Sequence, residues 1–149
     1  WGLMLDSLYL HIKTRDRLDD RLWSIIERQV ECALKAWREP DRGIWEVRGE
    51  PKHFTLSKVM CWLAAERGAG LATLREEEEL VKRWQDAADE IKADVLEHGV
   101  DDRGVFVQHY DTDALDGSLL LLPLFGFLPP DDPRIRATVA AINVRGWRA

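Results

Sequence analysis

Residues 81–95 read VKRWQDAADEIKADV, and the spacing of their apolar side chains predicts an α-helix. The apolar residues recur at intervals of three, four, three and four positions. Such intervals keep side chains on one face of a helix with 3.6 residues per turn. The residues on this face are Val81, Trp84, Ala88, Ile91 and Val95. The stretch therefore indicates a helix that buries one apolar face.

The same pattern extends upstream of this helix. Apolar residues three and four positions apart predict a short helix over about residues 5–12 and a longer one over about residues 18–37. The expected buried face of the longer helix consists of Leu18, Leu22, Ile25, Ile26, Gln29, Ala33 and Trp37. Another helix starts near residue 56, with Thr55 as its predicted N-cap. The acidic run Glu76–Glu79 is expected to be a solvated face near the start of the next helix, where carboxylates suit the helix dipole.

Two more helices are expected downstream. A nearly apolar stretch over about residues 115–125 predicts a buried helix, although it contains Gly117 and Pro123. A sixth helix is expected from about Pro133, since proline suits the first helical position, to about Asn143. No strand of convincing length appears in the sequence. The predicted fold class is therefore all-α.

The composition limits the class of protein. The chain has 149 residues, 46% of them hydrophobic, which suffices for one domain with a core but not for two ordinary domains. Its net charge of −6 argues against a general nucleic-acid or anionic-membrane binder, because such proteins need a basic face. No stretch approaches about 18 consecutive apolar residues, so no membrane-spanning helix is expected.

The two cysteines, Cys32 and Cys61, form neither a C-x-x-C pair nor a zinc-binding spacing. They are predicted to be buried thiols in a reducing compartment, which indicates a cytoplasmic protein. The first residues, Trp1-Gly2-Leu3, lack the basic region of a signal peptide, and the chain is expected to begin in mid-domain.

Two long loops carry related sequences. The first reads PDRGIWEV from Pro40, and the second reads DDRGVFVQ from Asp101. Because pairs of helices surround both loops, the recurrence predicts a helical-hairpin repeat of the kind found in α-solenoids and α/α toroids. If neighbouring helices run antiparallel, both loops emerge at the same end of the assembly. Loops of this length in a compact domain are usually functional.

Glu46 is the residue that distinguishes the first loop from the second. It stands where the second loop has Val107, and a purely structural repeat gives little reason for a carboxylate in one copy only. An apolar wall raises the pKa of a carboxyl group, and an aromatic face can stack on a sugar ring. A glutamate beside Trp45 therefore suits the acid of a glycoside hydrolase. The equally weighted alternative is a loop glutamate paired with Arg42 or Arg48.

Other polar residues offer weaker chemistry. His109, Asp111 and Asp113 match no strong metal-ligand spacing, and one of the two aspartates is predicted to cap the helix at 115–125. The sequence contains no Gly-x-Ser-x-Gly, no phosphate-binding glycine loop and no zinc signature. No metal or cofactor is therefore expected.

Two stretches of the chain resemble glycoside hydrolase family 15, which contains glucoamylases, glucodextranases and bacterial trehalase-like enzymes. The first stretch, GIWEVRGEPKHFTLSKVMCWLAAERGAGLA, runs from Gly43 to Ala72. The second stretch, DALDGSLLLLPLFGFLPPDDPRIRATVAAI, runs from Asp113 to Ile142. The resemblance is strongest to the bacterial trehalase-like branch.

The resemblance implies an (α/α)6 barrel of six inner and six outer helices, of which this chain carries about half. It implies inverting hydrolysis of α-glucosidic bonds, in α,α-trehalose or at the ends of α-glucans, without a cofactor. Glu46 then corresponds to the general acid and Trp45 to the adjacent aromatic residue of the substrate site. Arg48 becomes a candidate for binding sugar hydroxyls. Residues 1–142 then form part of the catalytic domain, and residues 143–149 form a non-matching tail.

The chain departs from the family pattern at the second carboxylate. The general base of the family is a glutamate near the C-terminal end of the catalytic domain, and nothing in this sequence resembles that segment. The N-terminal part of the barrel, with its Arg-Asp substrate-binding motif, is also unmatched. The expectation is a fragment that is inactive alone and leaves apolar helix faces open to self-association. The alternative is a helical-repeat interaction protein without chemistry, in which Glu46 is a loop salt-bridge residue.

Overall fold

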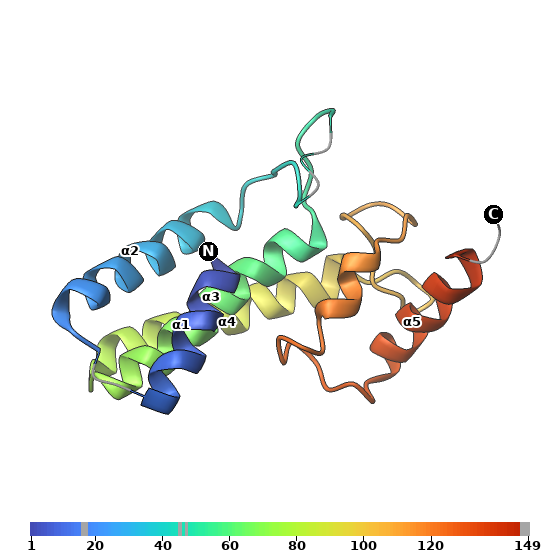
Figure 1. The fold of residues 1–149 in the computed structure, drawn as a ribbon. Helices are drawn as coiled ribbons and strands as arrows, with labels where there is room; N and C mark the ends of the chain where they lie inside the picture. Colours follow the sequence, from blue (N-terminus) through green and yellow to red (C-terminus); the bar gives the residue numbers. More distant parts are fainter. Residues whose placement is uncertain (16–17, 45, 47, 147–149) are drawn as a thin grey trace. The chain divides into compact units, whose positions relative to one another are not determined.

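The computed structural model describes residues 1–15, 18–44, 46 and 48–146, and these residues form an all-α fold (Figure 1). The α-helices in these ranges are α1 (Gly2–Arg15), α2 (Asp20–Ala36), α3 (Thr55–Leu74), α4 (Glu78–His98) and α5 (Pro133–Gly146), and the 3-10 helix η1 (Gly117–Leu121) precedes α5. Outside the helices, the described ranges contain only isolated β-bridges and no strand, which confirms the predicted fold class. No helix in these ranges is long and apolar enough to cross a membrane.

The chain folds into two compact units. The first unit is made of residues 1–39 and 60–91, and the second unit is made of residues 40–59 and 92–149. Helices α1 and α2 belong to the first unit, and η1 and α5 belong to the second. Each unit takes part of α3 and part of α4.

In the first unit, α1 runs parallel to α3. The guanidinium Nε of Arg67 donates to a carboxylate oxygen of Asp6 at 2.6 Å. Nearer the start of both helices, a Cβ added at Gly2 would lie 2.5 Å from the carbonyl oxygen of Met60. Contacts therefore follow the same order along both helices, and the missing side chain at Gly2 lets the two backbones approach closely.

Helix α2 and the segment after it run parallel to α4. Ion pairs join Glu31 to Arg83 and Arg38 to Glu90, again in the same order along both segments. Alternate helices that point in the same direction are the arrangement that helical hairpins produce. The predicted helical-hairpin repeat is therefore confirmed.

The chain reverses between α3 and α4 in a short turn. Glu76 adopts a left-handed backbone conformation with a φ of +60°. Its amide donates to the Thr73 carbonyl at 3.1 Å, and the amide of Glu77 donates to the Ala72 carbonyl at 3.0 Å. This pair of hydrogen bonds is a Schellman motif, which ends α3 and satisfies its last carbonyl groups.

Trp84 lies at the centre of the first unit's core, with no exposed surface. Its indole N–H donates to Glu31 at 2.8 Å, and its ring centroid lies 5.9 Å from that of Trp23. Gly68 of α3 faces the same site, where an added Cβ would lie 2.6 Å from the Val30 side chain. The tryptophan therefore joins α2, α3 and α4.

The buried helix faces confirm one sequence prediction and correct another. On α4, most of the predicted face is right, since no surface is exposed at Trp84, Ala88, Ile91 and Val95, whereas Val81 is only partly buried. On α2, the buried residues are Trp23, Ile26, Val30 and Ala33, followed by Trp37. Ile25 is 43% exposed, so the predicted face was wrong to include it and to leave out Trp23 and Val30. Adjacent residues in a helix point about 100° apart, and here Ile26 faces the core while Ile25 does not.

The two cysteines differ in burial. Cys61 is buried in α3, as predicted, whereas Cys32 is exposed on α2. The prediction of a buried thiol is therefore wrong for Cys32, which lies outside the 3–4 spacing of the buried face of α2. No disulfide joins the two residues.

In the second unit, the predicted helix over residues 115–125 is wrong in type and extent. Only Gly117–Leu121 is helical there, and it is a 3-10 helix. Pro123 has no amide hydrogen and cannot donate an α-helical backbone hydrogen bond. The stretch is also only partly buried, and its exposed residues are Leu120, Leu121 and Leu124. The last predicted helix, by contrast, is confirmed as α5.

The caps of α3 and η1 also differ from the sequence predictions. Asp116, and neither Asp111 nor Asp113, caps η1 by accepting the amide hydrogen of Ser118 at 2.8 Å. Thr55 is the first residue of α3, and its hydroxyl is buried with no hydrogen-bond partner among the described residues. The prediction of a Thr55 side-chain cap is therefore wrong.

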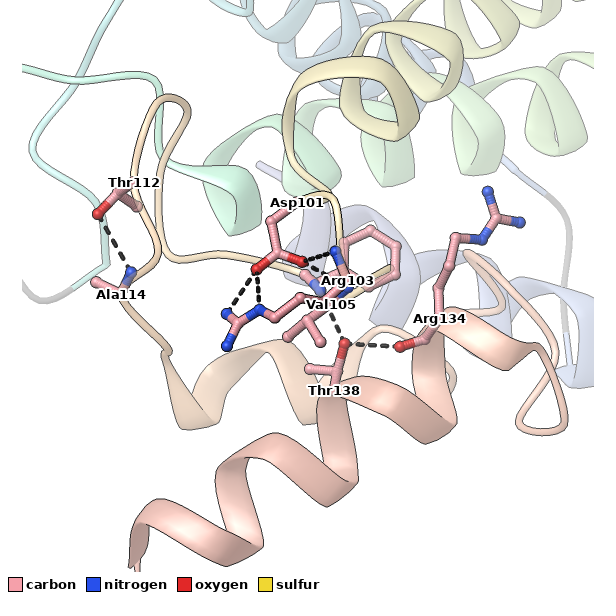
Figure 2. Close-up of polar contacts among 8 residues, drawn as sticks. Asp101, Arg103, Val105, Thr112, Ala114, Arg134 and Thr138 are labelled. Carbon is pink, nitrogen blue, oxygen red and sulfur yellow. Dashed lines mark hydrogen bonds and ion pairs between the residues drawn. The ribbon is translucent and has the colours of Figure 1, made fainter.

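Phe106 lies in the core of the second unit. It contacts Phe127 in the loop before α5 and Thr138 in α5. Its ring has no exposed surface and meets the ring of Phe127 edge-on, with centroids 6.2 Å apart. Its amide donates to the hydroxyl of Thr138 at 2.9 Å, and that hydroxyl donates to the Arg134 carbonyl at 2.7 Å (Figure 2). The buried Thr138 therefore fastens the loop before η1 to α5.

The first turn of α5 is stabilised by Asp132. One carboxylate oxygen accepts the amide hydrogen of Arg134 at 2.9 Å, and the other accepts from its guanidinium at 2.8 Å. The hydrogen bonds from Arg134 lower the pKa of Asp132 to about 2. The ionised form of Asp132 is therefore the one that supports the helix start.

Replacing Trp84 tests the core of the first unit. Trp84→Ala should lower the free energy of unfolding by about 3–5 kcal/mol, because it empties a fully buried aromatic site. Trp1→Ala is the matched control, since Trp1 is 50% exposed, and it should cost less than about 1 kcal/mol. Urea denaturation followed by circular dichroism measures both values. Equal losses for the two variants would contradict this core.

Acid titration tests the cap of α5. Above about pH 4 the Asp132 carboxyl is ionised in the folded and unfolded states, so its contribution to stability is complete. Between about pH 4 and about pH 2 the unfolded state takes up the proton first, and this contribution should be lost as the pH falls. Asp132→Asn cannot titrate, so its free energy of unfolding should depend less on pH over this range. Parallel pH profiles of the parent and the variant would refute the proposed cap.

Candidate functional site

The first long loop, residues 40–54, is closed at its neck by backbone pairing. The amide of Asp41 donates to the Lys52 carbonyl at 2.8 Å, and the amide of Lys52 donates to the Asp41 carbonyl at 2.7 Å. Within the loop, the guanidinium of Arg42 donates to the Gly49 carbonyl at 2.5 Å. The two ends of the loop are therefore held together within the second unit.

Gly43 sets the direction of the chain before Glu46. It has a left-handed φ of +68°, and its amide donates to the Asp41 carboxylate at 2.7 Å. A Cβ added at Gly43 would lie 3.0 Å from the ring of Phe54, so the glycine rests directly on that ring. The amide of Glu46 then donates to the Gly43 carbonyl at 3.3 Å. The position of Glu46 therefore depends on the contact between Gly43 and Phe54.

Glu46 itself is exposed and has a left-handed φ of +46°. This conformation is uncommon for a residue with a side chain, and such residues cluster at functional sites. Among the described residues, no ion pair joins Glu46 to Arg42 or to Arg48. The structural alternative of a loop salt bridge therefore finds no support in the described part of the loop. Arg48 is exposed in the same loop, and Trp45 lies outside the described residues.

The second long loop, residues 99–116, repeats the turn of the first loop with different polar contacts. Gly104 has a φ of +72°, close to that of the repeat-equivalent Gly43. Here the Asp101 carboxylate accepts the amide hydrogens of Arg103 and Val105 and pairs with the Arg103 guanidinium (Figure 2). Burial acts to raise the pKa of Asp101, but these hydrogen bonds outweigh it and lower the pKa.

The repeat-equivalent positions Glu46 and Val107 lie in different environments. Val107 is buried, and its amide donates to the Gly99 carbonyl at 3.0 Å, whereas Glu46 is exposed. The second loop therefore packs into the unit at the point where the first loop presents a carboxylate to solvent. This contrast agrees with the sequence argument that singled out Glu46.

The two long loops pair with each other, which agrees with their predicted emergence at the same end. The amide of Thr55 donates to the Gln108 carbonyl at 3.0 Å, and the amide of Tyr110 donates to the His53 carbonyl at 3.0 Å. Between these bonds, Phe54 and His109 form an antiparallel bridge. The return segment of the first loop is therefore held against the second loop.

Tyr110 is a central residue that the sequence analysis missed. Its ring stacks on His53 and on His98, with centroid distances of 5.6 Å and 5.4 Å. Its hydroxyl donates to Asp94 at 2.6 Å. Burial, with help from Asp94, raises the pKa of Tyr110. The i, i+4 spacing of Asp94 and His98 at the end of a predicted helix is the only local sequence signal that could have drawn attention to this site.

Two hollows border the second loop. One has a volume of about 300 Å³ and is lined by Pro51, Lys52, His53, His109, Tyr110 and Asp111. The other has a volume of about 630 Å³ and carries mainly acidic residues, among them Asp101 and Asp113. Glu46 lines neither of them. Asp111 borders both, but in the described ranges no group of His, Cys, Asp or Glu side chains is placed to hold a metal ion.

The sequence of the chain is similar to those of a family of hydrolases. The family model described as glycosyl hydrolases family 15 matches residues 1–145. The chain is 63% identical over 142 residues to a trehalase of Mycobacterium tuberculosis and 62% identical to one of Mycolicibacterium smegmatis, covering in each case 95% of this chain and 21% of the relative. A trehalase of Thermoplasma volcanium is 34% identical over 144 residues, covering 96% of this chain and 23% of the relative. The chain thus spans less than a quarter of the length of these relatives, and no solved structure matches it.

The two left-handed glycines provide a test of the contact beneath the first loop. Gly104→Ala should lower the free energy of unfolding by about 1–2 kcal/mol, the usual cost of a left-handed alanine, because no atom lies near its added Cβ. Gly43→Ala should cost about 1–3 kcal/mol more, because its Cβ also meets the Phe54 ring. Chemical denaturation compares the two variants. Equal costs would mean that Gly43 does not rest on Phe54 in solution.

Proposed function

Because the chain belongs to glycosyl hydrolase family 15, we propose that it forms the proton-donating part of an inverting α-glucosidase. The observation that carries the proposal is the 63% identity to a trehalase over 95% of the chain. Relatives named trehalase favour α,α-trehalose as the substrate over the ends of α-glucans. Since the chain spans less than a quarter of these relatives, the activity belongs to a longer protein.

In this proposal Glu46 is the general acid. Its carboxyl group protonates the glycosidic oxygen as the bond to the leaving glucose breaks, and it must therefore lie within hydrogen-bonding distance of that oxygen. Trp45 supplies an aromatic face for the sugar ring, and Arg48 donates hydrogen bonds to its hydroxyls. The lack of an ion pair between Glu46 and Arg42 or Arg48 in the described loop supports this role, because the carboxyl group stays available.

The general base of the reaction lies outside this chain in the proposal. An inverting mechanism needs a second carboxylate that activates water on the opposite face of the sugar, roughly 6.5–9.5 Å from the acid. No segment of this sequence resembles the family's base segment, and Asp111 and Asp113 are not proposed as substitutes. The 149-residue chain is therefore expected to be inactive by itself.

A second candidate function is a helical-repeat interaction protein without chemistry. The exposure of Glu46 favours this alternative. In that case Glu46 is a surface residue, and the protein binds neither trehalose nor a glucan end. The same experiment separates the two functions.

Substitution of Glu46 in an active enzyme tests the proposal. A chimera is made in which residues 1–145 replace the matching segment of the M. tuberculosis trehalase, and its release of glucose from trehalose is measured. Glu46→Gln should lower kcat by about 10²- to 10⁴-fold, because the amide cannot donate the proton in the way that the acid does. Glu50→Gln, an exposed glutamate in the same loop, should change kcat by less than about threefold.

Two results of this experiment would count against the proposal. Near-normal turnover by the Glu46→Gln chimera would exclude Glu46 as the acid. A correctly folded chimera that hydrolyses no trehalose before any substitution would favour the interaction protein.

A further inference from the structure

We propose that His109, in the second long loop, is a positioning residue for Glu46. The proposal rests on the proposed function, because it takes Glu46 as the proton donor. His109 acts through Phe54, which lies between it and the turn that leads to Glu46. All of these residues belong to the second unit.

Backbone pairing joins His109 to the end of the first long loop. His109 and Phe54 form an antiparallel bridge, and hydrogen bonds lie on both sides of it. Thr55 donates to Gln108 on one side, and Tyr110 donates to His53 on the other, each at 3.0 Å. The end of the first long loop therefore has a fixed register against the second.

The ring of His109 contacts the ring of Phe54. It meets the Phe54 ring edge-on at an interplanar angle of 80°, with centroids 5.6 Å apart. Phe54 is only 5% exposed and also contacts Gly43, where an added Cβ would lie 3.0 Å from its ring. The Gly43 carbonyl accepts the Glu46 amide. A continuous series of contacts therefore runs from His109 through Phe54 and Gly43 to Glu46.

Both ring nitrogens of His109 have polar partners. Nδ1 lies 2.7 Å from the Tyr110 carbonyl oxygen, which can only accept, so Nδ1 carries the hydrogen and donates it. Nε2 of the neutral ring then accepts from the Lys52 ammonium at 3.1 Å. The backbone of Lys52 closes the neck of the first loop by pairing with Asp41. The His109 imidazole therefore contacts both Lys52 at the neck of the first loop and the ring of Phe54.

Such support affects catalysis because an acid on a loop has to be placed accurately. A displacement of about 1 Å can cost as much as about 10²-fold in rate. Loops without support sample several conformations, whereas a rigid second layer of contacts restricts them. The second loop, which lacks a carboxylate at the equivalent position, therefore serves as the support for the first.

Amide hydrogen exchange on the 149-residue chain tests the mechanical part of the proposal. In His109→Ala, the neck amides of Asp41 and Lys52 should exchange at least about tenfold faster than in the parent. The amide of Phe106, which donates to Thr138 in the core, should keep its rate. His109→Phe keeps an aromatic ring against Phe54 but loses the hydrogen bond from Lys52, so it should restore part of the protection. Thr112→Ala removes a hydrogen bond of the second loop to Ala114 and should leave the neck amides unchanged.

Kinetics of the chimeric trehalase test the catalytic part. His109→Ala should lower kcat by about 10- to 100-fold while KM changes by less than about threefold, because the placement of the acid changes and sugar binding does not. His109→Phe should recover part of kcat, and Thr112→Ala should leave both constants within about threefold of the parent.

Each possible result bears on the proposal. Unchanged neck amides in His109→Ala, or equal acceleration of the neck amides and the Phe106 amide, would overturn it, since the second result indicates a general loss of stability. An altered KM with normal kcat, or no recovery in His109→Phe, would also overturn it. The exchange measurement needs no activity, so a failure of the proposed function, seen as an active Glu46→Gln chimera, is distinguishable from a failure of the positioning role.

Discussion

The antiparallel contact between Phe54 and His109 is the constraint on which the candidate site depends. It pairs the end of one long loop with the other, immediately before α3 begins at Thr55. Phe54 lies beneath Gly43, whose left-handed turn leads to Glu46. Without this contact the backbone turn that leads to Glu46 would lose its support from the second loop. The geometry of the proposed acid is therefore set by a residue from the other copy of the repeat.

The repeat explains how one loop can support the other. Two helical hairpins bring two similar turns into the same unit, and Gly43 and Gly104 keep nearly the same left-handed conformation. The copies then differ where it affects function, since Val107 is buried and the equivalent Glu46 is exposed. A buried valine anchors the second loop, and an anchored loop can hold its neighbour.

The sequence predicted the features that depend on local periodicity and short motifs. It predicted the all-α class and most of the buried face around Trp84, because helical spacing can be read along the chain. It also singled out Glu46, whose role stays a prediction. It missed the 3-10 geometry of η1, where Pro123 interrupts the hydrogen bonding of an apolar stretch. It also missed Tyr110 and the role of His109, because their partners are distant in sequence. Only the fold brings His53, Phe54 and Lys52 against that segment.

The most direct test of this account is the distance between the Glu46 carboxyl group and the glycosidic oxygen of a bound substrate. It can be measured in a crystal structure of the chimeric trehalase with a non-hydrolysable analogue of α,α-trehalose. The account predicts a separation of about 2.6–3.2 Å, the range that proton transfer by a general acid requires. A structure in which another carboxyl group occupies that position, while Glu46 remains in solvent, would contradict the account.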